Sequence, residues 1–143
     1  MAEHAANASE RGTGSNWSQG TTPTGTQHIY IGNEYSNTAT LSDAEPNVIA
    51  AGLTIQAGAT LNHSASTPQN PQLTDYLTNN GTINQSGGGR IYIIGGGSTN
   101  AISNSGIMSS ANIEVGFGTV TAASNLAVRT IIVSNGKSLK NAS

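Results

Sequence analysis

The chain contains no cysteine, few charged residues and no long apolar run. Without cysteine, neither a disulfide framework nor a thiolate metal site can hold the fold together. Charged residues make up 8% of the 143 residues, against about 25% in a typical soluble domain. The polar surface therefore has to be built from uncharged side chains. The lack of a long apolar run also argues against a membrane-spanning helix.

Cations are especially scarce, and the formal net charge is −2. The full set is Arg11, Arg90, Arg129, Lys137 and Lys140. These residues form no basic stripe that could neutralise a phosphate backbone or an anionic membrane surface. We therefore expect neither nucleic acid nor a membrane as a partner. A chain of this length is expected to form a single domain.

What the sequence does contain is Asn, Ser, Thr, Gln and Gly, which favour strands and turns over helices. From His28 onward, short β-branched or aromatic runs alternate with Gly, Asn or Ser, as expected of strands. The runs are HIYIG, TATL, LTIQAGATL, YLTNNGTI, GRIYIIG, ANIEV, GTVTAA and VRTIIVS. No window keeps helical spacing of apolar residues for more than about two turns. The sequence predicts an all-β body over residues 28–143.

Four of these segments resemble one another. Each has an aliphatic residue, a polar pair or triplet, a glycine, and a second aliphatic residue; the glycines are Gly58, Gly81, Gly106 and Gly136. Their spacing, which widens along the chain, falls within the range of about 20–45 residues that stacked structural repeats span, and it suits the coils of a β-solenoid. The sequence predicts about four to five coils, with an insertion or loop in the last ones. A β-sandwich is the alternative fold.

The segment from Asn16 to Gly97 resembles repeats in autotransporter passenger domains and related bacterial and phage surface proteins. Trp17, Ser18, Gly20 and Pro23 match an opening Trp-Ser-x-Gly-x-x-Pro motif. A Gly-Ala-Thr-Leu motif follows at residues 58–61, and an Asn-x-Gly-Thr-Ile motif at residues 79–83. The resemblance implies a right-handed parallel β-helix and leaves the function open, because fold does not determine activity.

Residues 1–27 are small and polar, and Trp17 is their only aromatic residue. They contain no apolar stretch of the kind found in a signal peptide, so we expect no export by that route. A segment this polar cannot offset its own ordering entropy. We therefore expect an extended arm that lies against a neighbouring subunit or a second protein, with folding back onto its own body as the alternative.

The stretch GGGRIYIIGGG, residues 87–97, raises the question of a phosphate-binding loop. Such a loop leads from a strand into a helix, and the Walker motif adds a lysine followed by Ser or Thr. Here a strand follows the glycines and that lysine is missing. We expect two glycine-rich turns that flank a buried strand of Ile91, Ile93 and Ile94. Arg90 is then expected at a corner, in a salt bridge or a partner contact.

The sequence also lacks a recognisable catalytic group. The acids are scattered, and the one close pair, Asp43 and Glu45, lies in a turn-like stretch, unlike the opposed carboxylates of a glycosidase. The histidines, His4, His28 and His63, show no metal-ligand spacing, and no G-x-S-x-G elbow occurs. We predict that the protein is not an enzyme and uses no cofactor or metal.

A solenoid of so few coils leaves open strand edges, which favours assembly with other chains. We expect a structural protein that decorates and cements a virus capsid, located on the virion surface. Its partners would be the major capsid protein or further copies of itself, with a homotrimer favoured. Partner contacts are expected at Arg11, Trp17, Pro23 and Arg90. The alternatives are an extracellular or cell-surface adhesin, fibre or matrix subunit, and a carbohydrate-binding module like those of phage tailspikes.

Overall fold

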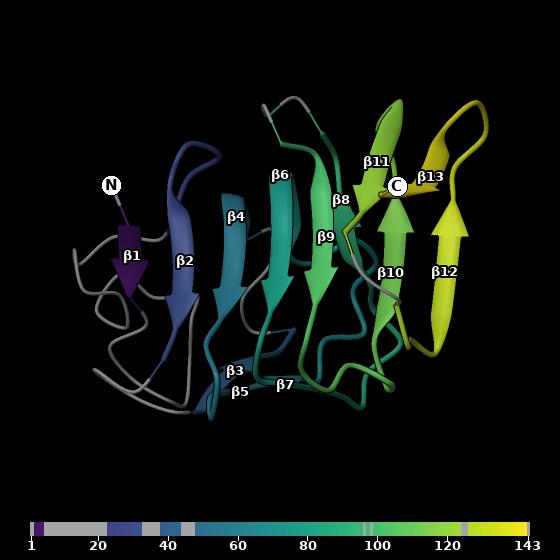
Figure 1. Ribbon diagram of the computed structural model, residues 1–143. Coiled ribbons are helices and arrows are strands. Elements are labelled where there is room, and N and C mark those ends of the chain that lie inside the picture. The colour runs from purple at the N-terminus through teal and green to yellow at the C-terminus, as the bar shows by residue number, and fades with distance from the viewer. Residues whose placement is uncertain are drawn as a thin grey trace.

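The computed structural model describes residues 2–4, 23–32, 38–43, 48–95, 97, 99–123 and 126–142. These residues form thirteen strands and no helix (Figure 1). The strands are β1 (Ala2–His4), β2 (His28–Ile31), β3 (Thr38–Leu41), β4 (Ile49–Ile55), β5 (Thr60–His63), β6 (Gln72–Asn79), β7 (Thr82–Gln85), β8 (Ile91–Ile93), β9 (Ala101–Asn104), β10 (Asn112–Val115), β11 (Thr119–Ala122), β12 (Thr130–Val133) and β13 (Ser138–Asn141).

The strands stack in parallel as a β-solenoid of about five turns. The first face runs from the start of β4 and the start of β6 through β8 and β10 to β12. The second face runs from β1 and β2 through the ends of β4 and β6 to β9, β11 and β13. The third face contains β3, β5 and β7. The predicted β-solenoid is confirmed, and the β-sandwich alternative is wrong, because sandwich sheets are antiparallel.

Alternate side chains of each strand fill the interior, because successive residues of a strand point to opposite faces of the sheet. On the second face the inward positions stack in register from coil to coil. They form a row of buried aliphatic residues, Ile29, Leu53, Leu77, Ile102 and Ala122. Each coil thus buries its apolar side chains against the coils before and after it, as expected of a solenoid.

The described residues beyond Ile102 continue the stack, with β10 and β12 on the first face and β9, β11 and β13 on the second. The predicted insertion in the last coils is wrong. Gly81 and Gly106 lie at one corner, between the second and third faces, whereas Gly136 lies between β12 of the first face and β13 of the second. The widest interval, from Gly106 to Gly136, therefore compares two different corners.

The later coils are shorter because the described part of the third face ends early. In that part of the chain, β7 is the last strand of the face, and beyond it Ile107 makes one isolated bridge to Thr82. The register partners Asn79 and Asn104 are separated by 25 positions in the sequence, whereas the later partners Thr119 and Ser138 are separated by 19. The solenoid therefore tapers toward its C-terminal end.

The N-terminal segment is described in two pieces. β1 pairs in parallel with β2, and Gln27 closes a turn by donating its backbone N–H to the Thr24 carbonyl at 2.9 Å. Pro23 is buried. Arg11 and Trp17, two of the expected partner contacts, lie outside the described residues. The predicted binding role of the arm stays a prediction.

Candidate functional site

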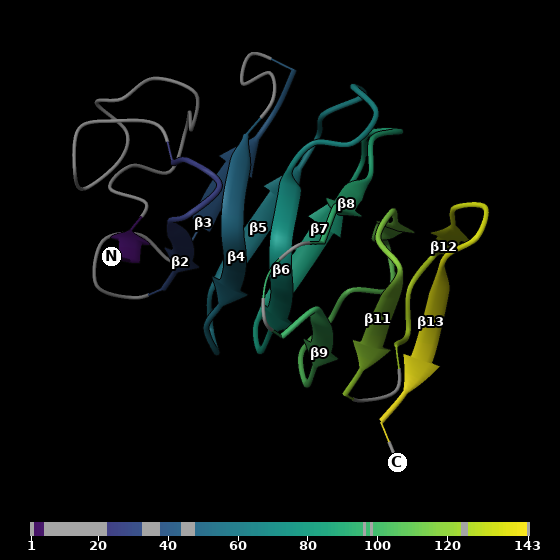
Figure 2. The same ribbon diagram turned by 90° about the horizontal axis from the view of Figure 1, so that it is seen from above.

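The end of the stack formed by the last coil is the strongest candidate for a functional surface. β12 and β13 lie at the opposite end of the molecule from β1 (Figures 1 and 2). Within the described residues, each of these two strands pairs on one side only, β12 with β10 and β13 with β11. Both strands therefore present an open edge.

Interior positions are exposed at this end. Ile131 and Val133 are the register partners of Ile113 and Val115. The two residues of β10 are 0% exposed, but Ile131 is 37% and Val133 is 41% exposed. The same inward row of the first face is thus closed at β10 and open at β12, so we name this surface, formed by β12 and β13, the open end.

Backbone groups at the open end also lack a partner among the described strands. Ser138 and Ala142 donate their N–H groups to the carbonyls of Gly118 and Ala122, at 2.8 and 2.7 Å. Because hydrogen-bonding direction alternates along a parallel strand, Leu139 and Asn141 direct their backbone groups away from β11. A further strand added at this edge would find donors and acceptors already aligned.

Charge is distributed unevenly along the sequence. Residues 115–143 carry Arg129, Lys137 and Lys140 and no acid, which is a net charge of +3. Residues 1–48, which include the first coil, carry five acids and one cation, a net charge of −4. Lys137 and Lys140 are exposed, whereas Arg129 donates from Nε to the Asn112 side chain at 3.0 Å. The open end therefore carries exposed aliphatic side chains, Ile131 and Val133, and two exposed lysines.

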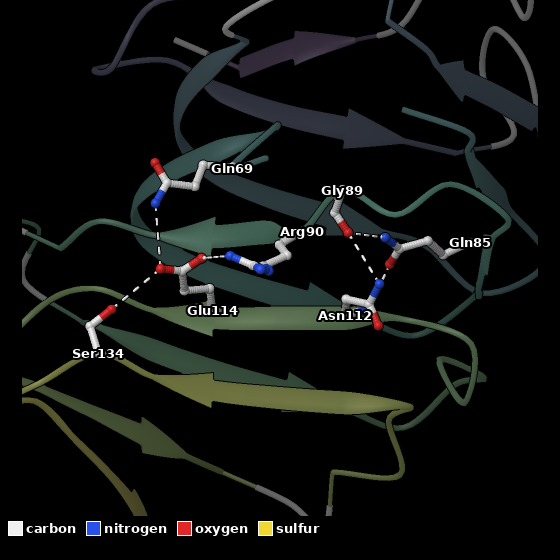
Figure 3. Close-up of polar contacts among 7 residues, drawn as sticks. All are labelled: Gln69, Gln85, Gly89, Arg90, Asn112, Glu114 and Ser134. Carbon is white, nitrogen blue, oxygen red and sulfur yellow. Dashed lines mark hydrogen bonds and ion pairs between the residues drawn. The ribbon is translucent and has the colours of Figure 1, made fainter. Parts of the chain in front are cut away.

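Arg90 lies in a salt bridge, one of the two roles expected for it. Its Nη1 donates to Oε2 of Glu114 at 2.9 Å (Figure 3). Oε1 of the same carboxylate accepts hydrogen bonds from Gln69 at 3.4 Å and from Ser134 at 3.3 Å. Glu114 is 6% exposed. The Glu114 side chain thus joins its own coil to segments of three others, so that four successive coils are tied together, and the partner-binding role of Arg90 stays a prediction.

The glycine triplet before Arg90 packs against the preceding coil. A Cβ added to Gly87 would lie 2.1 Å from the Ala65 carbonyl oxygen, so only glycine permits this approach. Ile91 and Ile93 are buried in β8, as predicted, but the prediction for Ile94 is wrong. Ile94 follows the end of β8 and is half-buried, because strand alternation turns it away from the interior.

Buried polar side chains hold the loops that leave the third face. His63 and Gln85 are register partners at the end of β5 and β7. His63 Nε2 bonds the Asn70 carbonyl, and Gln85 Nε2 bonds the Gly89 carbonyl. Burial lowers the pKa of His63 below its ordinary value of 6.5, although the bond to Asn70 opposes this. Sequence reasoning missed these roles; the alternation that places Leu61 and Ile83 inside also places both polar residues inside.

Asp43 and Asp75 anchor loops of the next coil. Asp43 is exposed and accepts the backbone N–H groups of Ser66 and Thr67 at 2.9 and 2.8 Å. Hydrogen bonds from the Ser66 and Thr67 side chains, followed by the Thr67 backbone, hold the pKa of Asp43 well below its usual range. Asp75 accepts two backbone N–H groups at 2.6 Å, from Thr99 and Asn100. Glu45, paired with Asp43 in the sequence, lies outside the described residues.

Two other surface features carry aromatic or amide groups. His28 stacks on Tyr76 with ring centroids 5.4 Å apart, and its Nδ1 lies 2.9 Å from the Tyr76 hydroxyl. Burial raises the pKa of Tyr76. On the third face an open depression of about 330 Å³ is lined by Asn62, Asn84, Gln85, Ser86 and Ser110. The first feature also includes Tyr30 and Asp75, which interact electrostatically with Tyr76.

No protein-family model, curated protein or solved structure matches the chain. Among the described residues, no three His, Asp or Glu side chains gather as a metal site would require. The same part of the chain contains no helix that is long and apolar enough to cross a membrane. The candidate site therefore depends on the geometry of the solenoid end alone.

Proposed function

We propose that the protein is a structural subunit that decorates and cements the shell of a virus particle. The observation that carries the proposal is the open end, where Ile131 and Val133 are exposed beside two strand edges that are open in the described part of the chain. A surface of this kind is completed by a protein that supplies a strand and apolar side chains. Mass action then stabilises the assembled state over the free subunits.

The chemistry of the open end favours a protein over other partners. Unpaired backbone donors and acceptors along a strand edge are satisfied by a second backbone, as in strand addition. The exposed aliphatic side chains of the last coil would be buried by such a partner, and this burial of apolar area favours binding. It requires no charged or aromatic group in the partner. The cations there number three in residues 115–143, too few for the phosphate contacts of a nucleic-acid site.

The body is suited to a mechanical role. Successive coils are joined by backbone ladders and by polar side chains that span from one coil to the next, such as Arg90 with Glu114. We infer that the solenoid is a rigid spacer and that residues 1–23, with Arg11, Trp17 and Pro23, bind the shell. The assembled form is a homo-oligomer on the virion surface, and a trimer remains our prediction for its size.

The experiment is binding to purified virus particles stripped of this protein. One variant replaces residues 5–22 with a Gly/Ser linker of equal length, which retains β1 and Pro23; a second is Trp17→Ala. We expect the wild-type protein to bind and to raise the temperature at which the particles disrupt. The linker variant should remain folded by circular dichroism and fail to bind. Full binding by the linker variant would remove the arm from the proposal, and no binding by the wild type would refute the shell role.

A second candidate is a fibre or matrix subunit on an extracellular or cell surface. The observation that favours it is the pair of strand edges, β12 and β13, that are open in the described part of the chain, in a sequence whose first 48 residues have a net charge of −4 and whose residues 115–143 have a net charge of +3. Unlike ends that attract one another generate open filaments when the contact does not close into a ring. Electron microscopy of the concentrated protein separates the candidates, because filaments in the absence of any particle would favour the fibre.

A further inference from the structure

We propose that the third face of the solenoid binds ice through a repeated array of threonine and asparagine side chains. The inference goes beyond the shell role and does not depend on it, because it uses β3, β5 and β7 and not the open end. The occupant is crystalline water, which is neutral and repeats at fixed spacings along its surface.

The outward positions of the third face repeat from coil to coil. β3, β5 and β7, each with the serine that follows it, read TATLS, TLNHS and TINQS; they begin at residues 38, 60 and 82, so both intervals are 22 residues. Two outward columns stand in register, Thr38 with Thr60 and Thr82, and Thr40 with Asn62 and Asn84. Asn84 is exposed and the other five are half-buried. The face therefore presents two columns of hydroxyl and amide groups.

This regularity is confined to the outward side of the third face. The inward residues of the same strands differ from coil to coil; they are Ala39, Leu61 and Ile83, then Leu41, His63 and Gln85. On the second face the outward residues differ as well, from Gly52 to Tyr76 to Ala101. Threonine pairs on neighbouring strands stabilise a sheet, but that benefit would apply equally to the second face. Repetition at this one surface indicates a ligand that itself repeats.

The spacing of each column matches that of ice. Neighbouring strands of a sheet lie about 4.7–4.9 Å apart. Water molecules in ice are joined tetrahedrally by hydrogen bonds of about 2.7–2.8 Å, so two oxygens bonded to the same water lie about 4.5 Å apart. Over two strand intervals the mismatch grows to only about 0.4–0.8 Å. Three successive polar groups of a column therefore stay in step with a row of the lattice.

The chemistry of the face fits a neutral ligand made of hydrogen-bonding groups. No outward position of β3, β5 or β7 holds a charged residue, which would orient nearby water around itself, or an aromatic residue, on which a sugar ring could stack. Asparagine offers a donor and an acceptor in one side chain. Threonine bonds water through its hydroxyl, and its methyl group restricts the orientations of the water beside it. Both side chains thus hold water in place.

The next coil extends the threonine column with an aliphatic side chain. Ile107 bridges Thr82 and is 61% exposed, whereas its neighbour Met108 is 1% exposed. The exposure of Ile107 is not a property of the open end, because β10 to β13 follow it in the chain. Beside the threonines, its methyl groups restrict the orientations of water in the same way. An exposed apolar residue that the rest of the fold leaves unexplained thereby joins the array.

The first test is ice growth in a solution of the full chain. We expect the wild-type protein to change the shape of the crystals and to hold the freezing temperature below the melting temperature. It should also be taken up into ice that grows slowly from the solution. Protein that is excluded from the ice and leaves the two temperatures equal would overturn the proposal.

A matched pair of variants tests the face. Thr60→Tyr places a bulky ring in the middle of the threonine column, and Thr121→Tyr makes the same change at a half-buried outward position of β11, on the second face. Tyrosine suits strands, so both variants should fold by circular dichroism. We expect Thr60→Tyr to lose the temperature gap and the uptake into ice, and Thr121→Tyr to keep both. Equal results for the two variants would show that the third face is not the binding surface.

Two further measurements keep the test decisive. Asn84→Tyr changes an exposed position of β7, so it should fold even if Thr60→Tyr does not, and it should also lose uptake into ice. Full uptake of a folded Asn84→Tyr would count against the array. Binding of the wild-type protein to insoluble cellulose or chitin, with no effect on ice, would assign the face to a crystalline polysaccharide and overturn the proposal.

Discussion

The open end predicts that one substitution has unequal costs at two equivalent positions. Ile113 and Ile131 occupy the same inward row on neighbouring coils, and they are 0% and 37% exposed. Ile→Ala removes three carbon groups, each worth about 0.8 kcal/mol when buried. At Ile113 the transfer term is about 2.4 kcal/mol, and a closed cavity brings the total into the range of about 2–5 kcal/mol.

At Ile131 only about 63% of the residue is buried, because 37% is exposed. The transfer term therefore falls to about 1.5 kcal/mol, and water enters the space left behind, so no closed cavity adds to it. We expect Ile113→Ala to lower the free energy of unfolding by about 1–3 kcal/mol more than Ile131→Ala does.

The assay is urea unfolding followed by circular dichroism, at a protein concentration low enough to keep the chain monomeric. The slope of the free energy of unfolding against urea concentration has to be equal in both variants for the comparison to measure stability. Equal losses at the two positions in the monomer would refute the reasoning, because they would show that the last coil is as closed as the coil before it.

Three further predictions concern the interior and the corners. The wild-type protein should lose stability as pH falls below 6.5, because the pKa of His63 is lowered in the folded state and the unfolded state binds the proton first. Over the same pH range, the free energy of unfolding of His63→Gln should fall less than that of the wild type. Arg90→Ala should cost about 1–2 kcal/mol in urea because Glu114 loses its cation, and adding Glu114→Gln should recover part of it. Gly87→Ala should cost about 1–3 kcal/mol in melting experiments through its clash with the preceding coil, whereas Gly88→Ala, with open space around it, should be nearly neutral.

The fold was predictable because its main signals are local. Alternation within short runs predicts which side chains point inward, and all eight runs read from the sequence contain part of a strand. The corner at Gly136 was misassigned because a polar turn with a glycine has the same sequence pattern at every corner of the stack. Tertiary packing decides which face a strand joins. No local sequence pattern shows that the third face ends before the other two.

A salt bridge was expected for Arg90, but neither its partner nor the other polar contacts were predicted, although coil length contains a signal for them. Arg90 and Glu114 are separated by 24 positions in the sequence, and Asp43 reaches Ser66 and Thr67 at separations of 23 and 24. Asp75 reaches Thr99 and Asn100 at 24 and 25. These separations are about the length of one coil. Each acid therefore meets a residue at the matching position of a neighbouring coil. A search for complementary polar residues one coil apart would have found these pairs, whereas a search for neighbouring acids could not.

The same rule explains why the open end is where function is to be sought. Each of these contacts joins one coil to the next, and so does each inward apolar row. Among the described residues, the coil of β12 and β13 has no following coil, so its edge bonds, its apolar row and its two exposed lysines all face outward together. A partner that resembles one more coil satisfies all three at once. Such a partner supplies a parallel strand and apolar side chains.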